Sequence, residues 1–294
     1  MGNSLNIKFY ILKGLYLIGS LLTINLFFYL LLAAFSPVFR KVNEIKNFKD
    51  KEYDLLIFGN SAGLDGIDAS LLSKKGLKSY NFCIGGSHIK SSVILLQNYL
   101  NANKRPKKVL LCLTSSMEGT FLKKYPFIDP CINHFYNKNI LERYLTIYLK
   151  EFEWLYIEIL KMLVSKQHRE AKMEDGQWQI KKTMTDETTF SEIPLININY
   201  NSNYLDYFVS FVKKNALELN VIEMPGWRKH RNTLPVEYEL VTRSGKVINI
   251  ENLNNLSIAD SLLNPRTDWL SLNHLNQFGA IKLTEYLHKK HFKN

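Results

Sequence analysis

The chain has 294 residues, more than the roughly 100 to 200 that one domain usually takes. Its 38 lysines and arginines outnumber its 27 acidic residues, so the formal net charge is +11. That balance favours contact with anionic lipid or anionic polymer. Basic blocks with interleaved aromatic residues, which are typical of nucleic-acid binders, do not occur, so we expect no nucleic-acid partner.

The three cysteines, Cys83, Cys112 and Cys131, are widely spaced and have neither a CxxC pattern nor histidine-rich surroundings. Cys83 and Cys112 lie in apolar, strand-like runs, where a free cysteine behaves as a small buried hydrophobe. The odd number argues against a disulfide framework, and the spacing gives no metal signature. A glycine-rich phosphate loop is missing as well, so we expect neither a metal nor another cofactor.

The stretch from residue 14 to residue 35 contains no charged residue and consists mostly of leucine, isoleucine, phenylalanine, tyrosine and alanine. Its 22 residues match the roughly 20 that a helix needs to cross a bilayer core. A cleaved signal peptide would have a shorter apolar region, of about 7 to 15 residues. A buried core helix is the other alternative, and the N-terminal position argues against it. We predict one transmembrane anchor, residues 1–36, that holds the protein in the lipid bilayer.

The charges that flank this helix do not settle its orientation. Lys8 and Lys13 precede it, and more basic residues follow it: Arg40, Lys41, Lys46 and Lys49. A literal positive-inside count would leave the C-terminal domain in the cytoplasm. Long domains are translocated largely regardless of charge, however, so this count is a weak guide.

After Pro37, which ends the apolar helix, the charged segment 37–52 is predicted to be a solvated linker, and the folded domain is expected at 53–294. Continuous apolar runs then predict strands, and helical patterns separate them. The strands are expected at residues 53–58, 79–84 and 108–114, and the helices at a short stretch up to 73 and at 88–101. This alternation predicts an α/β fold with a three-layer, mostly parallel sheet and helices on both faces.

The alternation breaks at about 115–200, which we interpret as an insertion. It contains an aromatic-rich helical pattern at 141–164 and a turn at Glu174-Asp175-Gly176. The apolar residues of that helix indicate either core burial or a cap against the bilayer, because its charges argue against a second span. The α/β pattern then resumes, with a helix at 204–219, a strand at 221–224, a hairpin at 238–250 around Arg243-Ser244-Gly245 and a terminal helix at 277–291.

Ser61 ends the motif Gly59-Asn60-Ser61, directly after the first strand. At the carboxyl edge of an open α/β sheet, side chains face the ligand crevice, and nearby backbone N–H groups can stabilise negative charge. Ser61 is therefore a candidate nucleophile that also donates its own N–H to an oxyanion. The alternative is that Ser61 only caps the next helix.

The second strand ends in Gly85-Gly86-Ser87. Glycines let the backbone approach an oxyanion closely, so Gly85 or Gly86 is a candidate second N–H donor. The alternative is an ordinary turn in which Ser87 caps the next helix. Near the C-terminus, His274 precedes the last helix and is a candidate general base and acid. A histidine in such a loop can equally be solvated or bonded to the helix start.

The order of these motifs resembles the SGNH (GDSL-like) hydrolase superfamily. The resemblance rests on Gly59-Asn60-Ser61, Gly66-Ile67-Asp68, Tyr80-Asn81-Phe82, Gly85-Gly86, and His274-Leu275-Asn276 with Gly279-Ala280. It covers the domain from about residue 53 to the end, without the insertion. More narrowly, the chain is similar to a membrane-anchored, extracytoplasmic branch associated with bacterial surface polysaccharides, which includes acetyltransferase-like members.

The resemblance implies an SGNH or flavodoxin-like fold in which Ser61 is the nucleophile and His274 the base. The oxyanion hole would then be formed by the N–H groups of Ser61 and of Gly85 or Gly86. Two positions depart from the family pattern. The family has an asparagine after the third strand, where this chain has Thr114-Ser115-Ser116, and it has an aspartate three residues before the histidine, where this chain has Ser271.

A serine hydroxyl can orient the imidazole but cannot offset its positive charge, and the aspartate of a Ser-His-Asp triad is worth about 10⁴ in kcat in the serine-protease example. Asp268 lies close in sequence and is the candidate replacement acid. The resemblance thus implies a membrane-anchored serine esterase or O-acyltransferase acting on acyl esters of a cell-surface polysaccharide. Its partners would be an acylated glycan or acyl donor and a membrane acyl-transfer protein. The alternative is an inactive SGNH-like component that binds or assembles envelope polysaccharide.

Overall fold

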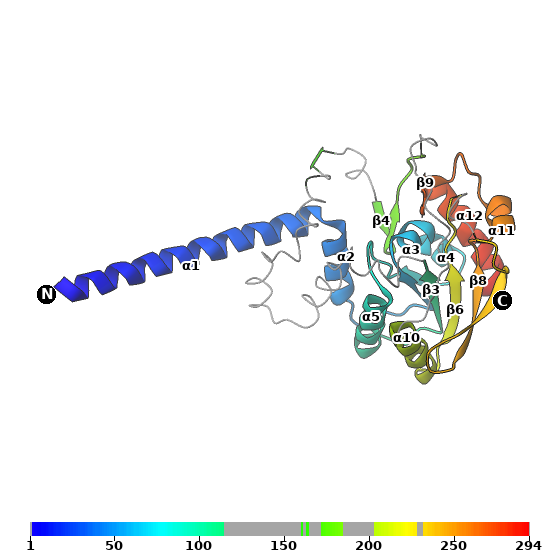
Figure 1. Ribbon diagram of the computed structural model, residues 1–294, viewed down its shortest axis with the longest axis horizontal. Coiled ribbons are helices and arrows are strands. Elements are labelled where there is room, and N and C mark those ends of the chain that lie inside the picture. Colours follow the sequence, from blue (N-terminus) through cyan, green and yellow to red (C-terminus); the bar gives the residue numbers. More distant parts are fainter. Residues whose placement is uncertain are drawn as a thin grey trace.

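The computed structural model describes residues 2–114, 160, 163–164, 172–184, 203–227 and 232–293. They form an α/β domain around a six-stranded sheet, with one long apolar helix at the N-terminus (Figure 1). The six-stranded sheet and its flanking helices confirm the predicted α/β class. Most of the helix expected at 141–164 lies outside the described residues, as does Cys131.

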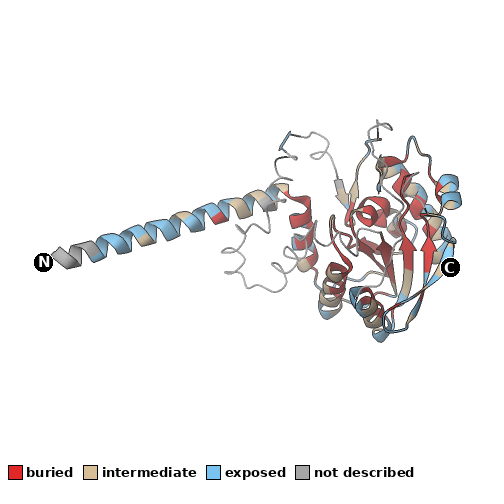
Figure 2. Cartoon of the chain, viewed as in Figure 1, coloured by how far each residue is buried: buried red, intermediate tan, exposed pale blue. Residues whose placement is uncertain are grey.

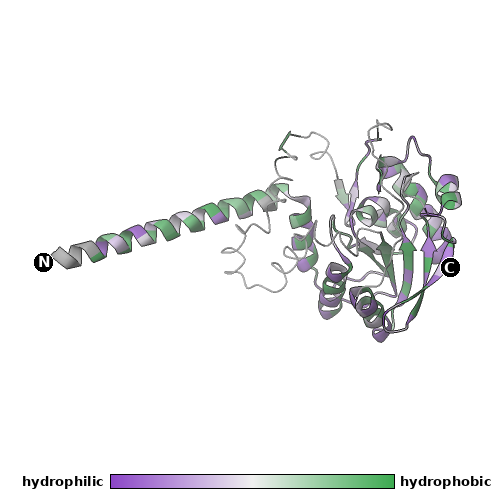
Figure 3. Cartoon of the chain, viewed as in Figure 1, coloured by the Kyte–Doolittle hydropathy of each residue, from purple (hydrophilic) through white to green (hydrophobic). Residues whose placement is uncertain are grey.

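The N-terminal helix α1 (Gly2–Phe35) projects from the domain, and the residues described from Ile7 onward are mostly exposed (Figure 2). Within it, Ile7–Phe35 is a stretch of 29 residues that is long and apolar enough to cross a membrane. Figure 3 shows this stretch as predominantly hydrophobic. A helix that is apolar on all sides and not covered by protein is suited to a lipid environment.

The next helix, α2 (Pro37–Lys46), corrects the prediction of a solvated linker at 37–52. Ser36 caps it, because the Ser36 hydroxyl accepts a hydrogen bond from the N–H of Phe39 at 3.2 Å. One face of the helix is buried against the domain: Pro37, Val38, Phe39, Lys41, Val42 and Ile45. The prediction was wrong because apolar residues spaced three and four apart form a helical stripe, which outweighs the intervening charges.

The central sheet has the strand order β2-β1-β3-β6-β8-β7. Its members are β1 (Leu55–Gly59), β2 (Ser79–Asn81), β3 (Lys108–Leu113), β6 (Glu218–Glu223), β7 (Glu237–Val241) and β8 (Val247–Asn252). All neighbouring strands pair in parallel except β7, which runs antiparallel to β8 at the edge. The mostly parallel sheet and the hairpin around residues 243–245 are confirmed.

The two faces of the sheet are covered by different helices. In β1, Leu56 and Phe58 point into a cluster with α2, α5 (Ile89–Ala102) and α10 (Asn203–Lys214). Leu55 and Ile57 point into a second cluster with α4 (Ala69–Lys74) and α12 (Gln277–Leu287). Side chains of a strand alternate between its two faces, so the predicted three layers are present.

Smaller elements complete the domain. They are α3 (Ser61–Gly66), β4 (Lys172–Glu174), β5 (Gln177–Gln179), α11 (Leu256–Leu262), β9 (Trp269–Ser271), β10 (His274–Leu275) and the π-helix η5 (His288–Phe292). β4 and β5 form an antiparallel hairpin whose turn lies at 175–176, as predicted. The hairpin packs against β2, since the N–H of Asn81 donates to the carbonyl of Asp175 at 2.9 Å.

The strand order also identifies the edge at which open α/β sheets usually bind ligands. From β1 the chain passes to β2 on one side, and it then crosses to β3 on the other side of β1. Ligands of open α/β sheets bind beyond the carboxyl ends of the strands at such a reversal. Residues 60–61, 82–86 and 114, which follow these three strands, therefore lie together at this edge.

Candidate active site

Ser61 is the first residue of α3 and follows β1 after a single intervening residue. The cap of α3 is Asn60, whose side-chain oxygen accepts a hydrogen bond from the N–H of Ala62 at 3.0 Å. The alternative in which Ser61 serves as the helix cap is therefore wrong. Its hydroxyl contacts another partner.

That partner is His274, 213 positions later in the chain. The Nε2 atom of His274 lies 2.8 Å from the Oγ atom of Ser61. This distance is in the range that a nucleophile and its general base require. The structure thus brings together the two residues proposed as nucleophile and base.

The other ring nitrogen of His274 contacts Ser271. Its Nδ1 atom lies 2.7 Å from the Oγ atom of Ser271. β9 and β10 pair antiparallel, with Ser271 opposite His274, and side chains of directly opposed residues lie on the same face of a hairpin. The short turn between these strands therefore places a serine hydroxyl where the family pattern has a carboxylate.

Burial lowers the pKa of His274 below its ordinary 6.5, and no carboxylate among the described residues opposes this shift. The ring is thus neutral near pH 7 and carries one proton. When Nδ1–H donates to Ser271, Nε2 is free to accept the proton of Ser61. This tautomer is the one that general-base catalysis needs.

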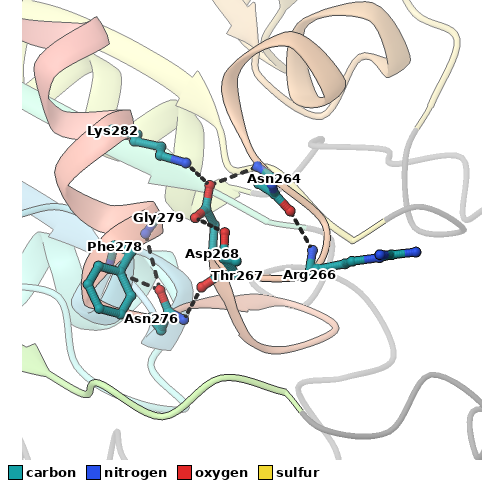
Figure 4. A network of polar contacts seen from close by, with 8 residues as sticks. All are labelled: Asn264, Arg266, Thr267, Asp268, Asn276, Phe278, Gly279 and Lys282. Carbon is teal, nitrogen blue, oxygen red and sulfur yellow. Dashed lines mark hydrogen bonds and ion pairs between the residues drawn. The ribbon is translucent and has the colours of Figure 1, made fainter.

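Asp268 does not take the place of the missing acid. Its buried carboxylate accepts hydrogen bonds from the N–H of Asn264 at 2.7 Å, the hydroxyl of Thr267 at 2.8 Å and the ammonium of Lys282 at 2.6 Å (Figure 4). Within the described residues, neither carboxylate oxygen contacts the ring of His274. The hydrogen bonds of Asp268 are directed to its own loop and to α12, which corrects the expectation that it replaces the acid.

Asp268 instead helps to hold the histidine hairpin against α12. Its carbonyl accepts the N–H of Asn276 at 3.0 Å, and the side-chain oxygen of Asn276 accepts the N–H groups of Phe278 and Gly279 at the start of the helix. A Cβ on Gly279 would lie 2.3 Å from the carbonyl oxygen of Asp268. The glycine is therefore required for the loop and helix to approach this closely.

The second motif lies beside the nucleophile. A Cβ built on Gly85 would have the Cβ of Ser61 as its nearest neighbour, at 4.0 Å. Ser87 does not cap α5, because the cap position is His88 and the Ser87 hydroxyl donates to the carbonyl of Gly59 at 2.8 Å. Gly85 therefore lies beside Ser61, and Ser87 holds its loop to the end of β1.

The segment after β3 also reaches the site. The side-chain amide of Asn60 donates to the hydroxyl of Thr114 at 2.6 Å. Thr114 is thus the member of the Thr114-Ser115-Ser116 trio that the structure places near Ser61, and the two serines lie outside the described residues. The sequence signals for Ser271 and Thr114 were their positions in the family blocks, whereas nothing in the sequence singled out Asn60 as the helix cap.

Two glycines allow the nucleophile turn to pack onto the sheet. A Cβ on Gly59 would lie 2.8 Å from the carbonyl oxygen of Cys112, and one on Gly63 would lie 2.7 Å from the sulfur of Cys83. Contacts this short are not tolerated by real side chains. The buried cysteines thus form the floor beneath the turn that presents Ser61.

Compared with known proteins, the chain matches no family model, no curated protein and no solved structure. Among the residues that the structure describes, no group of three or more histidine, cysteine or acidic side chains is arranged to hold a metal ion.

Proposed function

We propose that this protein is a membrane-anchored, SGNH-like serine esterase or O-acyltransferase that acts on acyl esters of a cell-surface polysaccharide. The observation that carries the proposal is the 2.8 Å contact between Ser61 Oγ and His274 Nε2. It is supported by the position of Ser61 at the carboxyl edge of the sheet and by a pKa of His274 that keeps the ring neutral.

In the acylation step, His274 Nε2 takes the proton of Ser61 as the serine oxygen attacks the ester carbonyl. The negative charge on the resulting oxyanion would be stabilised by the N–H groups of Ser61 and Gly85. The tetrahedral intermediate then collapses, and the protonated His274 returns its proton to the departing alcohol oxygen. The products of this step are an acyl-Ser61 ester and a free hydroxyl group.

In the second step, His274 removes a proton from the incoming group, which attacks the acyl-Ser61 carbonyl. Water as the incoming group gives hydrolysis and a free carboxylic acid. A sugar hydroxyl gives acyl transfer and a new ester on the glycan. In both cases His274 returns its proton to Ser61 Oγ, which restores the enzyme.

The substrate class and the compartment come from the motif resemblance together with α1. A single apolar helix would tether the domain to the membrane, and the proposed orientation places the domain outside the cytoplasm, where surface glycans are modified. The acyl donor would be an acylated glycan or an acyl carrier presented by a membrane partner.

A second candidate function is a non-catalytic component that binds or assembles envelope polysaccharide. The specific observation in its favour is that Ser271, not a carboxylate, contacts His274 Nδ1. A hydroxyl holds the ring in place but does not neutralise the imidazolium that forms during acylation.

The two candidates are distinguished by labelling the full-length protein in detergent with a fluorophosphonate probe, which modifies activated serines. The proposed function predicts labelling at Ser61, and loss of labelling and of aryl acetate hydrolysis in Ser61→Ala and His274→Ala. The matched controls are Ser261→Ala, an exposed serine on α11, and His288→Ala at the start of η5; both should behave as wild type.

Full esterase activity in the Ser61→Ala and His274→Ala variants would refute the catalytic proposal. A wild-type protein that is folded, as judged by a cooperative thermal transition, and that is neither labelled nor active on acyl esters would favour the binding component.

A further inference from the structure

Lys41 is a charged residue in the interior of the protein. Its side chain is only 1% exposed. Its ammonium group donates hydrogen bonds to the carbonyl of Cys83 and to the carbonyl of Gly176, the latter at 2.5 Å. Lysine is almost never fully buried unless its ammonium group is paired, so this position needs an explanation.

The two carbonyls belong to different parts of the chain. Cys83 lies between β2 and the Gly85-Gly86 motif, and Gly176 is in the turn of the β4–β5 hairpin. Lys41 itself is on α2, which directly follows the apolar helix α1 and packs against it, with the rings of Tyr29 and Phe39 5.5 Å apart. One ammonium group therefore joins the membrane-proximal helix, the insertion hairpin and the loop of the candidate site.

The segment that Lys41 contacts is also held by Asn81. The side-chain oxygen of Asn81 accepts the N–H of Cys83 at 2.9 Å, and its amide donates to the carbonyls of Gly63 and Ile67 at 2.9 Å each. Asn81 thereby ties the end of β2 to α3, the helix that begins with Ser61. Gly85, two residues after Cys83, abuts Ser61.

The energetics argue against a purely stabilising role for Lys41. Burial lowers its pKa from 10.5 to about 7, although Cys83, Glu44 and Asp65 favour the charged form. Asp65, four residues after Ser61, is itself buried, and burial raises the pKa of its carboxyl. Removing one member of a buried charged pair is destabilising, whereas replacing both members by uncharged side chains of similar volume is often neutral or stabilising. Methionine at position 41 combined with asparagine at position 65 would therefore serve the core, but methionine could not supply donors for the two carbonyls.

We propose that Lys41 is a positioning residue, which holds the Cys83–Gly85 segment in register with Ser61 and thereby makes the membrane-proximal helix and the insertion hairpin parts of the candidate site. The role in catalysis rests on the proposed function, whereas the ordering of the segment does not. The two can be tested separately.

The ordering is tested by hydrogen–deuterium exchange on the full-length protein in lipid nanodiscs. Lys41→Met is compared with Arg40→Met, which removes the same charge from the neighbouring exposed position of α2. We expect the amides of residues 83–87 to exchange at least about tenfold faster in Lys41→Met and to be unchanged in Arg40→Met. Equal exchange in the two variants would overturn the proposal, whether or not the protein is an enzyme.

The catalytic consequence is tested by the rate of Ser61 labelling and by ester hydrolysis. Misplacing an oxyanion donor lowers kcat more than it raises KM, so we expect kcat to fall about 10- to 100-fold while KM changes little. The double variant Lys41→Met/Asp65→Asn removes both charges. It should recover thermal stability but not kcat. Recovery of kcat would show that Lys41 serves only to balance Asp65 and would overturn the positioning role.

The contribution of the β4–β5 hairpin to the order of residues 83–87 is tested with a matched pair of glycines. Gly176 has φ of +79° and a Cβ there would lie 2.2 Å from the carbonyl oxygen of Asn81, whereas Gly245 has φ of +78° and open space around it. Gly176→Ala should displace the hairpin and accelerate exchange at residues 83–87, and Gly245→Ala should show only the backbone strain. Identical exchange in both would contradict a contribution from the hairpin.

If the wild-type protein is not labelled at Ser61 and hydrolyses no ester, the proposed function fails while the exchange experiment still decides whether Lys41 orders the segment. If the wild type is active and Lys41→Met retains its kcat and its exchange pattern, the positioning role alone fails.

Discussion

A carboxylate introduced at residue 271 should strengthen the candidate base. In the wild type, His274 Nδ1 contacts the hydroxyl of Ser271 at 2.7 Å, and burial lowers the pKa of the ring. In Ser271→Asp, a negative charge would stand beside the imidazolium that forms when Ser61 is deprotonated. This variant restores the residue type that the family resemblance implies at this position.

The magnitude follows from charge separation and burial. Two unit charges about 4 Å apart at an effective dielectric constant of about 20 attract by about 4 kcal/mol. Because the site is partly buried, the cost of desolvating the new carboxylate offsets part of this attraction. We expect a net gain of about 1.4 to 2.7 kcal/mol, which corresponds to a rise of about one to two units in the pKa of His274 and to a 10- to 100-fold higher plateau of kcat/KM.

The assay is kcat/KM for an aryl acetate from about pH 5 to pH 9, with the pKa of His274 followed by NMR. Because only the neutral ring accepts a proton, raising its pKa moves the acidic limb of the profile to higher pH. The increase in kcat/KM should therefore be largest on the alkaline side of the pH profile. The control Ser271→Ala leaves Nδ1–H without its partner and should lower kcat/KM by about 5- to 30-fold.

A Ser271→Asp variant whose His274 pKa rises while its plateau stays at or below that of wild type would refute the electrostatic reasoning. Equal activity in the wild type, Ser271→Ala and Ser271→Asp would mean that the contact at Nδ1 has no part in the chemistry.

Three further outcomes are expected. The wild-type profile of kcat/KM should have its acidic limb below pH 6.5, because burial lowers the pKa of His274 and activity is lost as pH falls through that value; a limb above pH 7 would contradict this. Asp268→Asn should lower the free energy of unfolding by about 1 to 3 kcal/mol and leave the acidic limb of the kcat/KM profile in place. A shifted limb together with a loss of about 10⁴ in kcat would instead identify Asp268 as the catalytic acid. Gly63→Ala should destabilise the protein by about 1 to 3 kcal/mol in urea unfolding, because its Cβ would lie 2.7 Å from the sulfur of Cys83. Gly66→Ala should be milder, because the short contact of its Cβ, at 2.7 Å, is with the flexible end of Met224, and its contacts with Leu275 and Leu283 are at ordinary distances; equal effects would contradict the steric argument.

The architecture was largely readable from the sequence. Continuous apolar runs at β1 and β3 matched buried parallel strands, and the Arg243-Ser244-Gly245 turn matched the β7–β8 hairpin. These features depend on residues close together in the chain, through backbone propensity and side-chain periodicity. The prediction failed at α2 because its charged residues suggested a solvated segment, although a single buried face was enough to make it part of the core.

The residues of the candidate site could be predicted from the sequence only in part. Motif order nominated Ser61, the Gly85-Gly86 pair and His274, and it flagged Ser271 as a departure. It could not say which side chain occupies His274 Nδ1, and Asp268 was the natural candidate because an aspartate fits that chemistry. The register of β9 on β10 places Ser271 there, and the hydrogen bonds to Asn264 and Lys282 direct Asp268 elsewhere.

By itself, the sequence determined an apolar N-terminal helix, an α/β domain and a short set of polar residues at strand ends, because hydropathy and spacing are properties of neighbouring residues. Only the tertiary structure decided that Ser61 and His274 meet across 213 positions, that the hydroxyl of Ser271 contacts the other ring nitrogen, and that Lys41, shortly after the apolar helix, is buried in the core. Such contacts depend on how whole elements pack and on which buried polar groups satisfy one another, and no local pattern encodes that choice.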